Sequence, residues 1–195
     1  MNLALGRAGV TLGLAAAVLG VITVGYGLIR KRPDLVRLSR WYAALVFLGG
    51  FVAACAMESA LITRDFTVKY VAENGSTKTP ALYNFATMWG ALEGSIILWA
   101  LILGGYLVAV VLKFRKRLAD PLVGWAVLTM LIVCVFFFGL MAGPANPFTG
   151  FSPPAGFDGP GPNPLLQNNL LMAFHPPMLY LGYVGFTVPF AFAIA

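Results

Sequence analysis

The hydrophobic residues of this chain fall into five long runs that are separated by shorter, more polar stretches. A helix needs roughly 20 apolar residues to cross the ~30 Å of hydrocarbon in a bilayer. The runs are too long for membrane strands and do not alternate apolar with polar positions. Each run is therefore predicted to be a transmembrane helix, at about 5–29, 41–62, 88–112, 122–142 and 176–195.

The composition supports a membrane protein. Hydrophobic residues make up 59% of the chain and charged residues 10%, against about 45–50% and about 25% in soluble domains. So few polar side chains do not cover the surface of a soluble fold, and a disordered chain or a small disulfide-stapled domain is excluded as well. The predicted fold class is all-α: a polytopic helix bundle that forms a single transmembrane domain over residues 1–195.

The positions of Lys and Arg predict the orientation. Nine of the 13 basic residues lie in the connections 30–40 and 113–121, which the positive-inside rule places in the cytoplasm. The loops 63–87 and 143–175 and the N-terminus are then external. Because topology accounts for these charges, the net charge of +6 does not indicate a nucleic-acid partner.

Three ionisable residues, Arg7, Glu58 and Glu93, lie inside predicted spans, each toward the external end. Such residues are costly in a bilayer and are candidates for function. Two interpretations stay open: an Arg7–Glu ion pair that fixes helix packing, or a polar cavity open to the outside. Near Glu93, the small residues Gly90 and Gly94 would let another helix approach closely. Together with the neighbouring Trp residues, they could instead form a flat surface on which an aromatic ligand binds.

The last external loop leads to the only histidine. Residues 143–164 contain seven Pro and five Gly, which favours an extended crossing of the external face. Asn163 and Pro164 then predict the start of a short interfacial helix. Because Pro176 and Pro177 follow His175, we expect extended backbone at His175, at the mouth of the fifth span. An imidazole there can ligate a metal or cap and pack.

Two motifs resemble one known family. Pro-Leu-Leu-Gln at 164–167 with His-Pro-Pro-Met-Leu-Tyr-Leu-Gly-Tyr-Val-Gly-Phe at 175–186, and Trp-Gly-x-x-Glu-Gly-Ser-x-x-x-Trp at 89–99, are similar to stretches of CcmF, the membrane subunit of cytochrome c haem lyase. The resemblance implies that His175 is an axial ligand of a b-type haem. It also implies a haem environment made by Trp89, Glu93, Pro176, Pro177, Met178, Tyr180 and Tyr183.

The same resemblance implies a setting. It places the protein in the inner membrane with its active face outside, where haem would be attached to a CxxCH apocytochrome c. The implied partners are the remainder of CcmF or a split partner chain, a CcmH-like thiol-reducing subunit, a CcmE-like haem chaperone, apocytochrome c and membrane lipid.

The sequence also departs from that family. Leu92 stands where the family usually has a polar residue, and the Trp-rich external motif, the second external His and the intramembrane His pair are absent. The chain is therefore expected to be part of a larger or split protein and to be inactive alone. A structural or assembly subunit, which docks through Gly90, Gly94, Gly182 and Gly185, and a transporter-like module stay open as alternatives.

Overall fold

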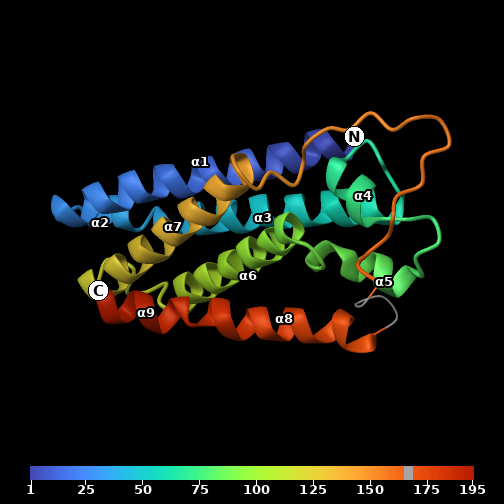
Figure 1. The fold of residues 1–195 in the computed structure, drawn as a ribbon. Coiled ribbons are helices and arrows are strands. Elements are labelled where there is room, and N and C mark those ends of the chain that lie inside the picture. Colours follow the sequence, from blue (N-terminus) through green and yellow to red (C-terminus); the bar gives the residue numbers. More distant parts are fainter. Residues whose placement is uncertain (165–168) are drawn as a thin grey trace.

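The computed structural model describes residues 1–164 and 169–195, and in this part of the chain it is all-helical (Figure 1). Five segments are long and apolar enough to cross a membrane, as predicted. They are α1 (Asn2–Ile29), α3 (Ser39–Ile62) together with the short helix that precedes it from Pro33, α6 (Leu92–Lys113), α7 (Pro121–Ala142), and α8 (Leu170–Gly185) continued by α9 (Thr187–Ile194). The short helices are α2 (Pro33–Val36), α4 (Lys69–Asn74), α5 (Ala81–Ala86) and the 3-10 turn η1 (Thr87–Trp89).

The centre of the bundle is the pair α1 and α3, which cross at glycine. A Cβ atom on Gly9 would lie 2.7 Å from the carbonyl oxygen of Gly49, and one on Gly49 would lie 2.6 Å from the backbone nitrogen of Gly13. Small residues at such a crossing let two backbones approach closely, which supplies packing where lipid removes the hydrophobic driving force. Helix α7 packs on α1 and helix α6 packs on α3.

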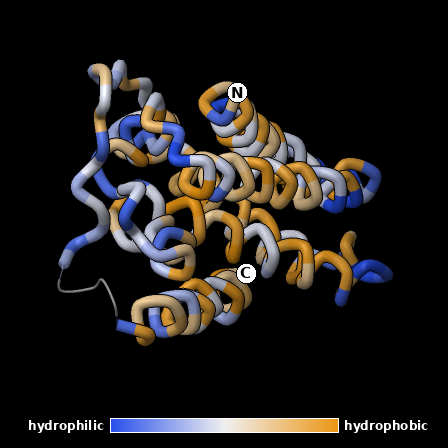
Figure 2. The backbone as a smooth tube through the Cα atoms, turned by 90° about the vertical axis from the view of Figure 1, so that its right-hand side faces the viewer, coloured by the Kyte–Doolittle hydropathy of each residue, from blue (hydrophilic) through white to orange (hydrophobic). Residues whose placement is uncertain are grey.

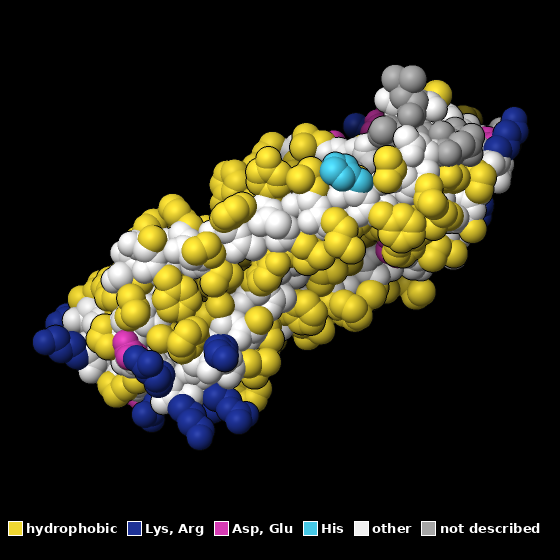
Figure 3. Space-filling view, turned by 90° about the horizontal axis from the view of Figure 1, so that it is seen from below, with side chains coloured by type: hydrophobic (Ala, Val, Ile, Leu, Met, Phe, Trp, Pro, Cys, Tyr) yellow, Lys and Arg dark blue, Asp and Glu magenta, His cyan; other side chains and the backbone are white. Residues whose placement is uncertain are grey.

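The bundle has two chemically different ends. Residues 30–38 and 114–120 form what we call the basic end, where Lys and Arg gather in Figure 3. The opposite end, called the loop end, holds the N-terminus, residues 63–91 and the crossing segment 143–164 (Figure 1). Figure 2 shows hydrophobic helices between hydrophilic connections, which is the division expected of a chain that spans a membrane.

Helices α1 and α3 both end in a Schellman motif. At α1, Arg32 N–H donates to the Gly27 carbonyl at 2.7 Å and Lys31 N–H to the Leu28 carbonyl at 3.3 Å. This leaves Lys31 in the left-handed region at φ 53°, where glycine is usual. Arg64 takes the same position after α3, at φ 54°.

Two predicted boundaries were wrong. The third span starts at Leu92 rather than Met88, since residues 87–89 form the separate turn η1. The fifth begins at Leu170 rather than Pro176, because Asn169 caps the helix by accepting from the N–H of Leu171 at 3.0 Å. His175 is therefore helical and not extended. The interfacial helix predicted after Asn163 falls largely on residues 165–168, outside the described residues.

Candidate functional site

His175 lies on the surface of α8 at the loop end and opens onto an apolar groove of about 330 Å³. The imidazole is exposed, as Figure 3 shows. The groove is lined by α8 and by the segment that precedes α6, and its lining residues are Trp89, Gly90, Asn169, Leu171, Met172, His175 and Pro176. The structure thus brings three predicted residues together, namely Trp89, His175 and Pro176.

Trp89 forms the fixed wall of this groove. Its side chain is buried, its ring packs edge-on against Phe85 at 5.2 Å between centroids, and its Nε1–H donates to the carbonyl oxygen of Met172 at 2.9 Å. In an uninterrupted helix, that carbonyl would accept from the N–H of residue 176. Residue 176 is proline and has no N–H. Trp89 therefore satisfies a carbonyl that Pro176 leaves free, which explains how the helix continues through a proline next to His175.

The other predicted haem-environment residues lie around α8 at different angles. Met178 is exposed one turn after His175, on the same side of the helix, and Tyr183 is exposed further along. Pro177 is partly buried. Tyr180 faces the bundle instead, where its ring lies 5.3 Å from that of Trp99. Of this set, Met178 is best placed to extend the apolar surface beside the imidazole.

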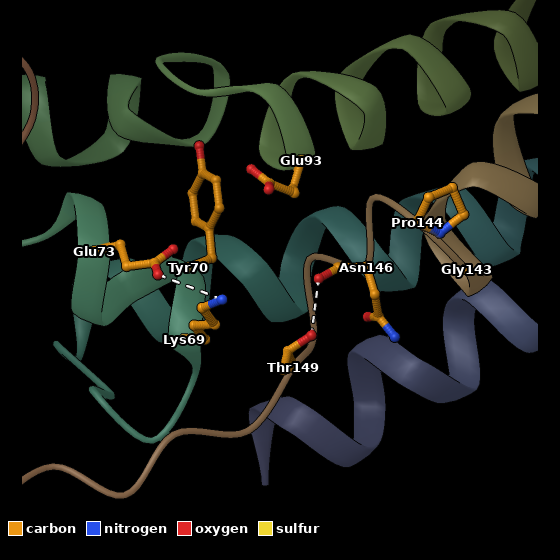
Figure 4. Close-up of a pocket in the computed structure, with 8 residues that line it drawn as sticks. All are labelled: Lys69, Tyr70, Glu73, Glu93, Gly143, Pro144, Asn146 and Thr149. Atoms are coloured by element: carbon orange, nitrogen blue, oxygen red, sulfur yellow. Dashed lines mark hydrogen bonds and ion pairs between the residues drawn. The ribbon is translucent and has the colours of Figure 1, made fainter.

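Glu93 lies elsewhere, in a polar pocket of about 140 Å³ between α4, the start of α6 and the crossing segment (Figure 4). The same pocket contains an ion pair of 3.5 Å between Lys69 and Glu73. Figure 4 shows the Glu93 carboxylate close to the ring of Tyr70. Residue Glu93 is thus not part of the lining of the His175 groove.

Tyr70 connects this pocket with the base of the Trp89 segment. Its hydroxyl donates to the carbonyl oxygens of Thr87, at 2.8 Å, and of Met88, at 3.0 Å. Burial raises the pKa of the Tyr70 hydroxyl, so the group stays a neutral donor. A Cβ atom on Gly94 would lie 2.5 Å from the same hydroxyl oxygen, so a larger side chain at 94 would displace it.

The three ionisable residues of the spans do not form one cluster. Arg7 uses its Nε–H to donate to the carbonyl of Phe148 at 2.9 Å and makes no ion pair with Glu58 or Glu93 in the described structure. Both carboxylate oxygens of Glu58 are buried and have no hydrogen-bond partner among the described residues. The predicted Arg7–Glu ion pair is therefore wrong, since Arg7 instead holds the crossing segment.

The lining of the groove contains one imidazole. His175 is the only histidine of the chain, and the described residues contain no group of three or more His, Cys, Asp or Glu able to hold a metal ion. A closed zinc site takes four such ligands. A single exposed imidazole can supply one ligand to a metal ion.

Comparison with known proteins identifies the family of the chain. Residues 89–195, which include both walls of the groove, match the family described as Cytochrome C assembly protein. The chain belongs to this family. Its relatives include the cytochrome c-type biogenesis protein CcmF of Escherichia coli, 40% identical over 94% of the chain. The CcmF of Pseudomonas fluorescens is 42% identical over 83% of the chain.

A solved structure shares the fold of this chain. The structure, titled "Cytochrome c Heme Lyase CcmF", superposes with a TM-score of 0.83 at 36% identity and covers 98% of the chain. The chain corresponds to only 29% of that structure, and to 28% and 24% of the two bacterial relatives. It therefore spans less than a third of the proteins that it matches.

One feature of the groove is not evident from sequence reasoning. Trp89 and the paired prolines both stand out in the sequence, but the bond between them joins residues 83 positions apart. The available signal was the missing N–H of Pro176, which requires another donor for the Met172 carbonyl. The sequence does not say which donor that is.

Proposed function

We propose that this chain is the part of a cytochrome c haem lyase subunit that presents His175 to haem iron at the external face of the inner membrane. The single observation that carries the proposal is the exposed imidazole of His175 beside the apolar wall built on Trp89. Family membership and the printed names of the relatives support it. The positive-inside rule supports placing the loop end outside the membrane.

The residues at the groove fit one side of a haem. Trp89, Leu171 and Met178 would offer apolar contacts to a porphyrin, and the imidazole of His175 would hold its iron. Neutral imidazole binds metal through its unprotonated nitrogen. Because the chain has one histidine, a second histidine ligand would come from the remainder of the protein or from a partner chain.

The role of this chain in haem attachment is then positioning. When bound, haem supplies the vinyl groups to which the cysteine thiols of a CxxCH apocytochrome add. His175 would hold the haem beside α8, and the Trp89–Met172 bond fixes α8 against the segment before α6. Holding reactants in one geometry lowers the entropic part of the barrier, while the cofactor carries the chemistry.

The same proposal defines the partners. Apocytochrome c must approach with reduced thiols, so a thiol-reducing subunit of the CcmH type belongs to the assembly. Haem must be delivered to the external face, which is the task of a CcmE-like chaperone. The remainder of the lyase, or a split partner chain, covers the exposed side of α8 and α9, where Phe174, Phe186 and Phe190 are all more than half exposed.

The experiment is replacement of His175 by Ala in the full membrane assembly, with haem absorbance and cytochrome c maturation as readouts. We expect both to fall strongly. Ile22→Ala is the control, because Ile22 is an exposed residue of α1 that lies outside the groove and away from α8 and α9, and it is expected to leave both readouts unchanged. Bound haem and maturation at wild-type level in His175→Ala would leave the structural role of α8 as the better account.

A further inference from the structure

The basic end carries a second groove that the haem role does not use. It has a volume of about 490 Å³, larger than the groove at His175, and lies between the end of α1, helix α2 and the start of α7. Its apolar lining includes Leu28, Val36 and Trp125, and its cationic lining is Lys31 and Arg32. One cavity therefore combines an apolar floor with a cationic rim.

Among the described residues, only one of the two cations of the rim is paired with a carboxylate of the chain. Arg32 forms an ion pair of 2.8 Å with Asp34 in which both side chains are more than half exposed. Lys31 has no ion pair among the described residues. The surrounding basic end adds further Lys and Arg residues (Figure 3). The rim thus has positive charge available for an anion.

Lys31 has an unusual backbone conformation, which makes a clean substitution possible. Lys31 is the left-handed residue of the Schellman motif that ends α1, a position at which glycine is favoured. Replacing Lys31 with glycine therefore removes the ammonium group and does not strain the local backbone, because glycine adopts the left-handed conformation more readily than lysine. This separates a role in ligand binding from a role in ending the helix.

The position of the groove indicates its depth in the membrane. It is formed where α1 ends and α7 begins, and Trp125 lies one turn inside α7 with an exposed side chain. Aromatic residues of this kind mark the level of lipid headgroups. A ligand in this groove therefore lies with one part in hydrocarbon and one part at the polar boundary.

We infer that this groove binds an anionic phospholipid. Its phosphate contacts Lys31 and Arg32, and an acyl chain lies along Leu28 and Trp125. Charge complementarity selects an anion, and the apolar floor selects one that carries a hydrocarbon chain. Basic pockets between transmembrane helices bind anionic lipid headgroups in this way. A soluble anion would leave the apolar floor in contact with water.

The test measures thermal unfolding of the full chain in detergent during titration with phosphatidylglycerol. Phosphatidylcholine with the same acyl chains and inorganic phosphate are titrated in parallel. We expect phosphatidylglycerol alone to raise the unfolding temperature. Lys31→Gly is expected to unfold at the wild-type temperature or above it without lipid, and to bind phosphatidylglycerol about fivefold more weakly.

Lys116→Gln is the matched control. Lys116 is an exposed cation of the same end that does not line the groove, so this variant is expected to bind within about twofold of the wild type. Three results would overturn the proposal. They are equal effects of the two lipids, an effect of inorganic phosphate as large as that of phosphatidylglycerol, and an equal loss of binding in Lys116→Gln and Lys31→Gly.

Discussion

The indole N–H of Trp89 donates a hydrogen bond of 2.9 Å to the carbonyl oxygen of Met172, the acceptor that Pro176 leaves without a helical donor. This one bond joins the segment before α6 to the first turns of α8. It sets the shape of the groove into which His175 opens. The proline pair next to the histidine is therefore compatible with a continuous helix because of a tryptophan far away in the sequence.

Trp89→Phe is expected to lower the free energy of unfolding by about 1–3 kcal/mol, because it leaves the buried Met172 carbonyl unpaired. Thermal or denaturant unfolding in detergent measures the change. Trp125→Phe serves as the control, since Trp125 is exposed and makes no such bond in the described structure.

Pro176→Ala tests the explanation for that loss. Alanine restores an N–H that can donate to the Met172 carbonyl within the helix. We therefore expect Trp89→Phe to cost less in the Pro176→Ala background than in the wild type. Equal costs in both backgrounds of this double-mutant cycle would show that the indole stabilises α8 by packing alone.

Gly9→Ala is expected to destabilise the bundle by about 1–3 kcal/mol, since its Cβ atom meets backbone atoms of α3 that cannot move aside. The measurement is again unfolding in detergent. Gly139→Ala on α7 is the control, because a Cβ atom there has nothing within 4 Å. Alanine is the better helix former, so the control is expected to be neutral or stabilising by up to about 1 kcal/mol.

Docking of the crossing segment is expected to depend on pH through Asp158. Its carboxylate accepts from the N–H of Thr77 at 2.8 Å and from its hydroxyl at 2.7 Å, and these bonds hold the pKa of Asp158 below its ordinary value of 3.8. The contribution is complete above pH 3.8 and is lost as the pH falls through the lower, folded-state pKa. Hydrogen exchange at the Thr77 amide measures it.

Asp158→Asn is expected to remove this pH dependence. Asp120→Asn is the matched control, because Asp120 also has a lowered pKa, through its bond to Arg117, but lies at the basic end. Unchanged pH dependence of the Thr77 amide in Asp158→Asn would show that another group controls the segment.

The sequence predicted the fold well because hydrophobic runs of membrane length have few alternatives. The five spans and the all-α class were confirmed. The start of the fifth span was wrong for a physical reason: the rule that proline ends a helix assumes that the freed carbonyl finds no other donor. Trp89 supplies one for the Met172 carbonyl.

The residues expected around His175 lie together only in part. The family resemblance implied that Trp89 belongs to the same site as His175, and the structure puts both in one groove. The resemblance also grouped Glu93 with them, but Glu93 points into the pocket beside Tyr70. The groove at Lys31 was not predicted, because its cations were interpreted only as determinants of topology. A cavity between three helices depends on how those helices pack together. The pattern of hydrophobic residues along the sequence does not give that packing.

The most direct test of the proposed haem role is His175→Gly in the full membrane assembly, with haem absorbance measured before and after imidazole is added. Glycine removes the ligand and leaves space for free imidazole beside the apolar wall. We expect the variant to lose bound haem and to regain it when imidazole is supplied. Haem at the wild-type level without imidazole would contradict ligation by His175.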